Sequence, residues 1–405
     1  MGAVVIANQN PAVTELKHLS LLGRMRESAH SAQLQFNDLC PMSFKVNTLI
    51  VIGRLLQLAA AASLAAVVVL SFTITPTVLL GLVPTLLSGI AGSLLVSSAP
   101  AIAWELTQLL YIPRAFVPGQ PVGIENADGL SCWLAAALQM MANSASIHTR
   151  LRALPDVMVG PLNAQQRLRD LYPASPLNQF LDCYQMTRDS AQRVASNIDV
   201  LGIRNYLSVL TNGEIAPGDT QEDAAAALEA VFGPMALHPL RQAYNGGAPR
   251  DRPEATIQVA MSPPAATHRP NFHEMFLNYF NYIDDQGGRF RLQFQTAPNA
   301  MVVQLKRFLQ ADVAGRFQGV KNSDLVDIPS QLDLSPDLIE DGSQGSYKCD
   351  MFVVHLGTVN SGHYYTMVKA AGLWWMCDGS RVQEVTERQA LAELPSAYLV
   401  HYTKI

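Results

Sequence analysis

The sequence predicts an α+β domain preceded by a hydrophobic two-helix hairpin, and three features of the chain carry this prediction. First, residues 55–104 contain no Asp, Glu, Lys or Arg. Second, a strongly helix-forming run follows Cys132. Third, the C-terminal part alternates between runs rich in β-branched and aromatic residues and short turns with glycine. The chain has 405 residues, which is enough to bury a sizeable core.

The composition excludes several classes of protein. Only 15% of the residues are charged, against roughly 25% in a typical soluble domain. The 28 basic and 33 acidic residues give a formal net charge of −5, which provides no overall field for holding nucleic acid. The five cysteines are widely spaced and form no C-x-x-C pair, so neither a disulfide framework nor a zinc ribbon is expected. The working parts are therefore expected in a reducing compartment.

The missing charges are concentrated in one segment, which predicts a transmembrane hairpin. Residues 55–72 and 78–96 are apolar and are separated by a short stretch that contains Pro76. A membrane-spanning helix needs about 20 mostly apolar residues, and each run has about that length. Basic residues flank the hairpin on both sides, so both ends are expected on the cytosolic side. The alternatives are a buried hairpin in a soluble core and a single span with a re-entrant second half.

These patterns divide the chain into four parts. We expect residues 55–103 to contact a lipid bilayer, as part of a multi-pass membrane protein whose C-terminal domain faces the cytosol. The predicted parts are a polar N-terminal tail (1–48), the transmembrane hairpin (49–104), a linker rich in Pro and Gly (105–120) and a C-terminal domain (121–405), which contains all the candidate residues described below.

Cys132 is the first candidate for a chemical role. A turn-rich stretch ends at Ser131, and the helix-forming run starts directly after it. Unpaired backbone N–H groups and the positive end of the helix dipole favour a thiolate at that place. The alternative is that Cys132 is a small buried hydrophobic residue, which is the common fate of cysteine.

A second group of candidates lies near the C-terminus. A strand-like run ends at Leu356, a glycine-containing turn follows, and another strand-like run begins at His363. The next run, Leu373 to Cys377, is expected to be the partner strand in a hairpin and to place Asp378 at its end. Adjacent antiparallel strands can bring Asp378 to the His363 ring, as a third group that orients the base of a thiol nucleophile.

Four motifs in this order resemble those of the ubiquitin-specific protease family of deubiquitinating enzymes. The segment Met301 to Phe308 is similar to the family's L-V-I-x-L-K-R-F strand, and Gln221 to Ala224 to its Q-x-D-A box. The Cys box is matched by Gly123, Asn126, Gly129, Cys132, Trp133, Leu134, Ala136, Leu138 and Gln139, and the His box by His355, Gly357, Gly362, His363, Tyr364, Trp374 and Asp378.

The resemblance implies a papain-like cysteine protease fold with a thumb, a palm and reduced fingers. It implies that Cys132 attacks the carbonyl after the terminal Gly-Gly of ubiquitin, that His363 is the base and that Asp378 orients it. Gly362, Tyr364 and Trp374 are implied to line a narrow channel for the substrate tail, although core packing is the alternative for Trp374. No metal and no cofactor are expected, because no cysteine lies between residues 240 and 300, where the family commonly holds zinc in its fingers.

The chain departs from the family pattern in several places. The family's oxyanion-stabilising Asn lies five residues before the Cys, where this chain has Ala127, and Asn126 is one position further away. Asp128 is the neighbouring polar alternative, but a carboxylate is a poor donor to an oxyanion unless it is protonated. Gly379 replaces a frequent second Asp or Asn, and Ala226 replaces an acidic residue.

The sequence leaves three alternatives to this assignment, and the altered segment before Cys132 favours the first of them. They are a catalytically impaired membrane scaffold that binds ubiquitin, a protease for another ubiquitin-like modifier with a Gly-Gly tail, and a general papain-like peptidase. The two-part hydrophobic segment is also similar to that of secreted inclusion-membrane proteins of intracellular bacteria. That similarity implies a bacterial effector that acts on ubiquitin at a host membrane.

Overall fold

The computed structural model describes the chain from residue 117 onward, as part of a unit that begins at Phe116. The residues described are 117–126, 128–153, 171–172, 174–195, 198–217, 220–233, 237–245, 247–261, 271–283, 287–313, 316–359 and 362–405. The predicted tail and transmembrane hairpin lie outside these residues. Within the described part, no helix is long and apolar enough to cross a membrane.

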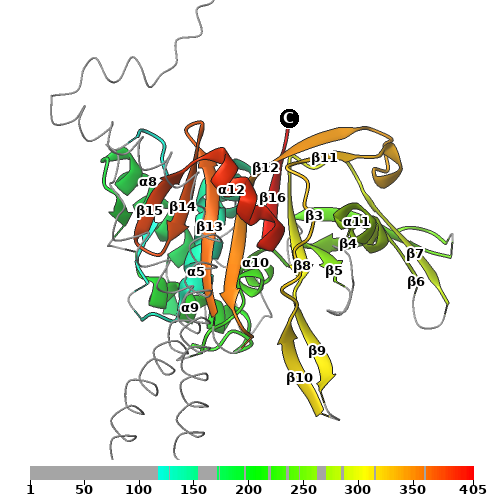
Figure 1. The fold of residues 1–405 in the computed structure, drawn as a ribbon, viewed down its shortest axis with the longest axis horizontal. Helices are drawn as coiled ribbons and strands as arrows, with labels where there is room; N and C mark the ends of the chain where they lie inside the picture. Colours follow the sequence, from blue (N-terminus) through cyan, green and yellow to red (C-terminus); the bar gives the residue numbers. More distant parts are fainter. Residues whose placement is uncertain are drawn as a thin grey trace, which may run out of the picture. The chain divides into compact units, whose positions relative to one another are not determined.

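The first half of the unit is helical. Its central helix, α5 (Cys132–Asn143), is rich in Ala, Leu and Met, and every residue before Asn143 is buried. In Figure 1 the helices gather on one side of the central sheet, and α5 lies against β13 (Gly362–Ala370). The other helices of this half are α6 (Ala145–Arg152), α8 (Pro176–Asp189), α9 (Val200–Leu210) and α10 (Ala224–Phe232), with the short strands β1 (Gly123–Ile124) and β2 (Val194–Ala195).

The second half contains the central sheet, with strand order β15-β14-β13-β12-β16-β8-β5. All its neighbours are antiparallel except β5 and β8, and β11 pairs with β12. Consecutive residues of the middle strands are buried, so both faces of these strands are covered, and their sequences are nearly continuous apolar runs. The strands are β5 (Ile257–Ala260), β8 (Ala300–Lys306), β11 (Gln331–Leu334), β12 (Gly345–Gly357), β13, β14 (Leu373–Asp378), β15 (Arg381–Val385) and β16 (Ala397–Lys404), with α12 (Glu387–Glu393) and the 3₁₀ turns Pro336–Leu338 and Leu394–Ser396 between them.

A smaller four-stranded sheet, of order β4-β3-β7-β6, carries α11 (Phe272–Phe280) and corresponds to the predicted reduced fingers. Near its tip, the ring of Phe290 lies 4.6 Å from the rings of both Tyr244 and Tyr282. This aromatic stack joins three strands where no cysteine is present. The strands are β3 (His238–Tyr244), β4 (Arg250–Glu254), β6 (Asn281–Ile283) and β7 (Arg289–Phe294); β9 (Phe308–Val313) and β10 (Arg316–Lys321) form a separate hairpin that projects beyond the central sheet in Figure 1.

Candidate active site

Cys132 is the first residue of α5, as the sequence predicts, and its side chain is 2% exposed. The preceding residue, Ser131, does not cap the helix with its side chain. In this respect α5 differs from every other α-helix in the described residues, each of which begins with a side chain that accepts a backbone N–H. The N–H groups at the start of α5 therefore remain available to an anion beside the Cys132 sulfur.

Asp128 shapes the turn that leads into this helix. Its carboxylate accepts the backbone N–H groups of Leu130 and Ser131, both at 2.9 Å, and the Ser131 hydroxyl at 2.6 Å. Burial by itself raises the pKa of Asp128, but these hydrogen bonds and the nearby charge of Arg204 bring the pKa below its ordinary value. An ionised carboxylate has no proton to give, so Asp128 is not a donor to an oxyanion.

The side chain of Asn126 is held by a hydrogen bond to its amide oxygen. Its Oδ1 accepts the backbone N–H of Ser131 at 2.9 Å, which leaves the Nδ2 group as the donor. Gly379 lies beside it, and a Cβ on Gly379 would be 3.8 Å from the Asn126 Cβ. The φ of Gly379 is +55°, a backbone conformation that favours glycine. The positive φ therefore gives the physical reason for glycine at this position, since a Cβ would have room there.

His363 and Asp378 lie next to each other at the ends of paired strands. The distance from His363 Nε2 to Asp378 Oδ1 is 2.5 Å. The hydrogen bond with Asp378, followed by the one with Cys132, raises the pKa of His363 to about 10, and burial opposes this rise. The imidazole is therefore favoured in its protonated form between a carboxylate and a sulfur. The structure thus brings Cys132, His363 and Asp378 together, across large separations in the sequence.

His355 supports the start of the strand that carries His363. Burial, followed by the charges of Lys321 and His363, lowers the pKa of His355 to about 4, so its ring is neutral. A Cβ on Gly362 would overlap this ring. The resemblance implies that Gly362 lines the channel for the substrate tail; in the structure, the His355 ring occupies the space where a side chain at this position would begin. Glycine is needed here for the packing of His355.

Trp374 lies in the core, which is the alternative given for it in the sequence analysis. Trp374 is 2% exposed and packs against Phe352, with ring centroids 5.8 Å apart. The neighbouring Trp375 is equally buried and donates its indole N–H to the Ala370 carbonyl. Both tryptophans lie in the core because the strand has a buried environment on each face. Tyr364 is 5% exposed and packs on the His355 ring, at 4.5 Å between centroids.

Two residues near the site were not assigned a role from the sequence. Gln221 was noted only as part of a motif, yet its side-chain amide contacts the backbone of Gly362. Arg204 was not noted, although its side chain is fully buried in α9. The available signal was a single arginine on the apolar face of a helix, between Val200 and Leu207 at helical spacing.

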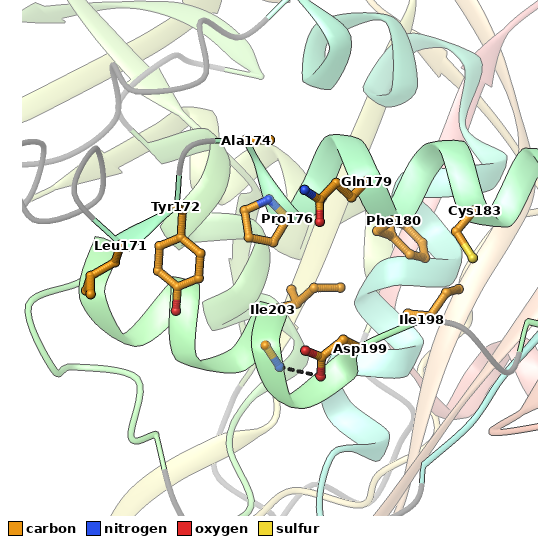
Figure 2. Close-up of a pocket in the computed structure, with 11 residues that line it drawn as sticks. Leu171, Tyr172, Ala174, Pro176, Gln179, Phe180, Cys183, Ile198, Asp199 and Ile203 are labelled. Atoms are coloured by element: carbon orange, nitrogen blue, oxygen red, sulfur yellow. Dashed lines mark hydrogen bonds between the residues drawn. The ribbon is translucent and has the colours of Figure 1, made fainter.

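A separate pocket lies between α8 and α9 (Figure 2). It has a volume of about 280 Å³ and contains none of the residues discussed above. Figure 2 shows that apolar side chains such as Phe180 and Ile203 line it together with the polar side chains of Gln179 and Asp199, with Cys183 toward one end. In the residues that the structure describes, no group of three or more His, Cys, Asp or Glu side chains is arranged to hold a metal ion.

Comparison with known proteins gives consistent matches. Residues 122–402 match the family described as ubiquitin carboxyl-terminal hydrolase. "Ubiquitin carboxyl-terminal hydrolase 19" from Arabidopsis thaliana is 34% identical over 121 residues, which is 28% of this chain and 17% of that protein. "Ubiquitin carboxyl-terminal hydrolase 15" from Saccharomyces cerevisiae is 32% identical over 114 residues, 25% of this chain and 9% of that protein. The chain therefore matches less than a fifth of the length of either relative.

Two solved structures share the fold. One is a SAGA deubiquitinase module, of a Ubp8 variant with Sgf11, Sus1 and Sgf73, bound to monoubiquitin; it has a TM-score of 0.50 and 16% identity, over 77% of this chain and 75% of that one. The other is described as "Structure of the SAGA Ubp8/Sgf11/Sus1/Sgf73 DUB module bound to ubiquitin aldehyde", with a TM-score of 0.50 and 18% identity, over 77% and 76%. At this level of identity the similarity establishes the fold alone.

Proposed function

Because the chain belongs to the ubiquitin carboxyl-terminal hydrolase family, we propose that it is a thiol-dependent deubiquitinase that hydrolyses the peptide or isopeptide bond after the C-terminal Gly-Gly of ubiquitin. One observation carries the proposal: His363 is hydrogen-bonded both to Asp378 and to the Cys132 sulfur. The distance from His363 Nε2 to Asp378 Oδ1 is 2.5 Å. The sulfur lies at the uncapped start of a helix. This arrangement suits a nucleophile, a base and an orienting group.

The reaction proceeds through an acyl-enzyme. The Cys132 thiolate attacks the carbonyl carbon, a C–S bond forms, and protonated His363 gives its proton to the leaving amine as the C–N bond breaks. A water molecule then attacks the thioester while His363 takes its proton. Hydrolysis releases the carboxylate of ubiquitin and restores the thiolate. Asp378 keeps the imidazole oriented and stabilises its protonated form.

The oxyanion of the tetrahedral intermediates requires donors that are already in place. We assign this role to the Nδ2 group of Asn126 together with the backbone N–H of Cys132. The Asn126 amide oxygen accepts the Ser131 N–H at 2.9 Å, so the amide is already oriented before the reaction begins. The extra residue between Asn126 and Cys132, relative to the family pattern, is accommodated by the turn that Asp128 stabilises.

An electrophilic ubiquitin probe tests the proposal on the full chain. We expect the wild type to form a covalent adduct, and Cys132→Ala and His363→Ala to form none. Cys183→Ala is the matched control, since it removes a half-buried thiol from the separate pocket and should retain labelling. A wild type that binds ubiquitin without labelling would favour the scaffold instead. Labelling only by probes of another modifier would assign the protease to that modifier.

We also propose that residues 55–103 anchor this enzyme to a membrane, with the catalytic domain on the cytosolic side. The support is the absence of charged residues from a segment long enough for two spans. In a flotation experiment with phospholipid vesicles, the full chain should rise with the lipid, and a variant without residues 55–103 should stay at the bottom. Equal behaviour of the two proteins would disprove the anchor and leave the proposed chemistry intact.

A further inference from the structure

The side chain of Gln221 bridges two segments that are 141 positions apart. Its Nε2 donates to the Gly362 carbonyl at 3.0 Å, and its Oε1 accepts the Gly362 N–H at 3.2 Å. The two hydrogen bonds run in opposite directions, as they do between paired strands, so the amide fixes both the position and the rotation of the Gly362 backbone. Gly362 is the first residue of β13 and directly precedes His363.

His363 needs such support because its own packing is incomplete. Its side chain is 40% exposed, and it stands in the second pair of residues after the β12–β13 turn, opposite Leu356. The Asp378 carboxylate orients the ring from one side. The backbone that carries the ring is held by strand pairing with β12 and by Gln221.

Gln221 is itself held in place by a buried cation. Arg204 is fully buried; its Nε donates to the Ala216 carbonyl at 2.9 Å, and its Nη2 donates to the Thr220 carbonyl at 2.5 Å. Thr220 is the residue directly before Gln221. The guanidinium group is planar and rigid, so these two bonds fix the Thr220 carbonyl, directly before Gln221, relative to the Ala216 carbonyl.

The third nitrogen of Arg204 faces the turn that precedes Cys132. Its Nη1 lies 3.9 Å from Asp128 Oδ2, and the guanidinium carbon lies 5.7 Å from the centroid of the Trp133 ring. Trp133 is the second residue of α5. Asp128 binds the two N–H groups just before the helix. Arg204 therefore contacts the Cys132 segment on one side and the Gln221 segment on the other.

We propose that Gln221 is a positioning residue of the active site, which, with Arg204 behind it, holds His363 at the Cys132 sulfur. Gln221 does not contact the reacting atoms and acts through the Gly362 backbone. The inference rests on the proposed function. In this proposal, Gln221 and Arg204 couple the nucleophile, Cys132, to its base, His363.

Alkylation of Cys132 in the full chain tests this role without any ubiquitin. Iodoacetamide reacts with the thiolate and releases iodide, and mass spectrometry of the Cys132 peptide gives the rate at each pH. At neutral pH the wild-type Cys132, hydrogen-bonded to His363, should be alkylated faster than a free thiol. In Gln221→Ala the alkylation should be slower, and the midpoint of the rate against pH should move to higher pH. With ubiquitin as substrate, kcat should fall by roughly tenfold while KM changes less than about twofold.

Graded variants sharpen the test. Gln221→Glu keeps an acceptor for the Gly362 N–H but loses the donor, so its midpoint should lie between those of the wild type and Gln221→Ala. Gln185→Ala is the matched control, because Gln185 also makes side-chain hydrogen bonds, to Asp189 and Arg188 on α8, and contacts neither segment. Its midpoint and kcat should equal those of the wild type. Since Gln221 is exposed, these variants do not remove buried contacts.

The outcomes separate the inference from the proposed function. A wild-type Cys132 that is alkylated no faster than a free thiol would contradict its pairing with His363 and therefore the proposed function. A fast wild-type alkylation whose midpoint Gln221→Ala leaves in place, with unchanged kcat, would overturn the positioning role alone. A rise in KM without a shift in midpoint would make Gln221 a substrate contact and would also overturn it. Arg204→Lys keeps the positive charge but loses the paired guanidinium donors. If this variant has the melting temperature and the alkylation midpoint of the wild type, Arg204 has no part in the coupling.

Discussion

The protonation state of His363 is set by its two neighbours. The hydrogen bond with Asp378 is the largest cause of its raised pKa, and the one with Cys132 is the second. Both neighbours stabilise the positive charge on the ring. In the proposed reaction, this ring proton is the one given to the leaving amine.

Replacing Asp378 should therefore shift the pH dependence of the reaction. The wild type needs the imidazolium form, which is lost as the pH rises through about 10. In Asp378→Asn the main cause of the raised pKa is absent, so the basic limb of kcat/KM against pH should move to lower pH. The rate at neutral pH should fall by roughly 10²-fold, because the base is less well oriented. A basic limb that stays in place would show that Asp378 does not set the pKa of His363.

Asn126 allows a second test at the scale of one residue. Its Nδ2 group is the proposed oxyanion donor, so Asn126→Ala should lower kcat by roughly 10²–10³-fold with little change in KM. Asn126→Asp is nearly the same size and can still accept the Ser131 N–H, but it lacks the donor and should be equally impaired. Steady-state kinetics of the two variants give the comparison. A normal rate in either variant would show that other groups build the oxyanion hole.

At the scale of elements, helix starts have two different uses in this fold. Most described helices satisfy their first N–H groups with a side chain, as α12 does through Thr386 and Gln389 in a capping box. In α5 the Ser131 hydroxyl donates to Asp128 instead, and no side chain caps the helix. The missing cap costs some helix stability. It leaves unpaired N–H donors and the positive end of the helix dipole at Cys132, where the proposed reaction uses them.

The capping box predicts a stability change that leaves the chemistry intact. Thr386→Ala removes the acceptor for the Gln389 N–H, so the free energy of unfolding should fall by about 1 kcal/mol. Urea unfolding of the full chain, followed by circular dichroism, measures the loss. Labelling by the ubiquitin probe should be unchanged in native buffer, since Thr386 is not part of the site. An unchanged free energy of unfolding would mean that the cap does not stabilise α12.

At the scale of the whole molecule, packing between the two halves assembles the site. The helix α5 lies against β13, and β13 pairs with β14, so Cys132, His363 and Asp378 meet where the helical half contacts the sheet. The finger sheet is held by aromatic packing near its tip, with Phe290 between Tyr244 and Tyr282. These rings can hold three strands together without a bound ion.

Removal of metal ions should therefore change neither stability nor activity. Incubation of the full chain with EDTA should leave the melting temperature and the rate of probe labelling as they were. The reason is that the finger region, residues 240–300, has no cysteine and uses aromatic contacts where a zinc site could stand. A lower melting temperature after chelation, restored by added zinc, would disprove this account.

The order of the elements and the main site residues could be predicted from the sequence because they depend on local patterns. The helix that starts at Cys132 follows from a turn before a run of helix formers, and the strands around His363 and Asp378 follow from β-branched and aromatic runs. The burial of Trp374 could not be predicted in this way, because alternation along one strand does not tell which of its faces another layer covers.

By itself, the sequence determined where the helices and strands form and which thiol, imidazole and carboxylate are available, since propensity, polarity and turn chemistry act over a few residues. Only the tertiary structure decided which way Asn126 points, that the His355 ring occupies the space beside Gly362, and that Gln221 and Arg204 connect the two halves of the site. These features depend on contacts between segments far apart in the chain. Such contacts are decided by which surfaces fit together when the core closes.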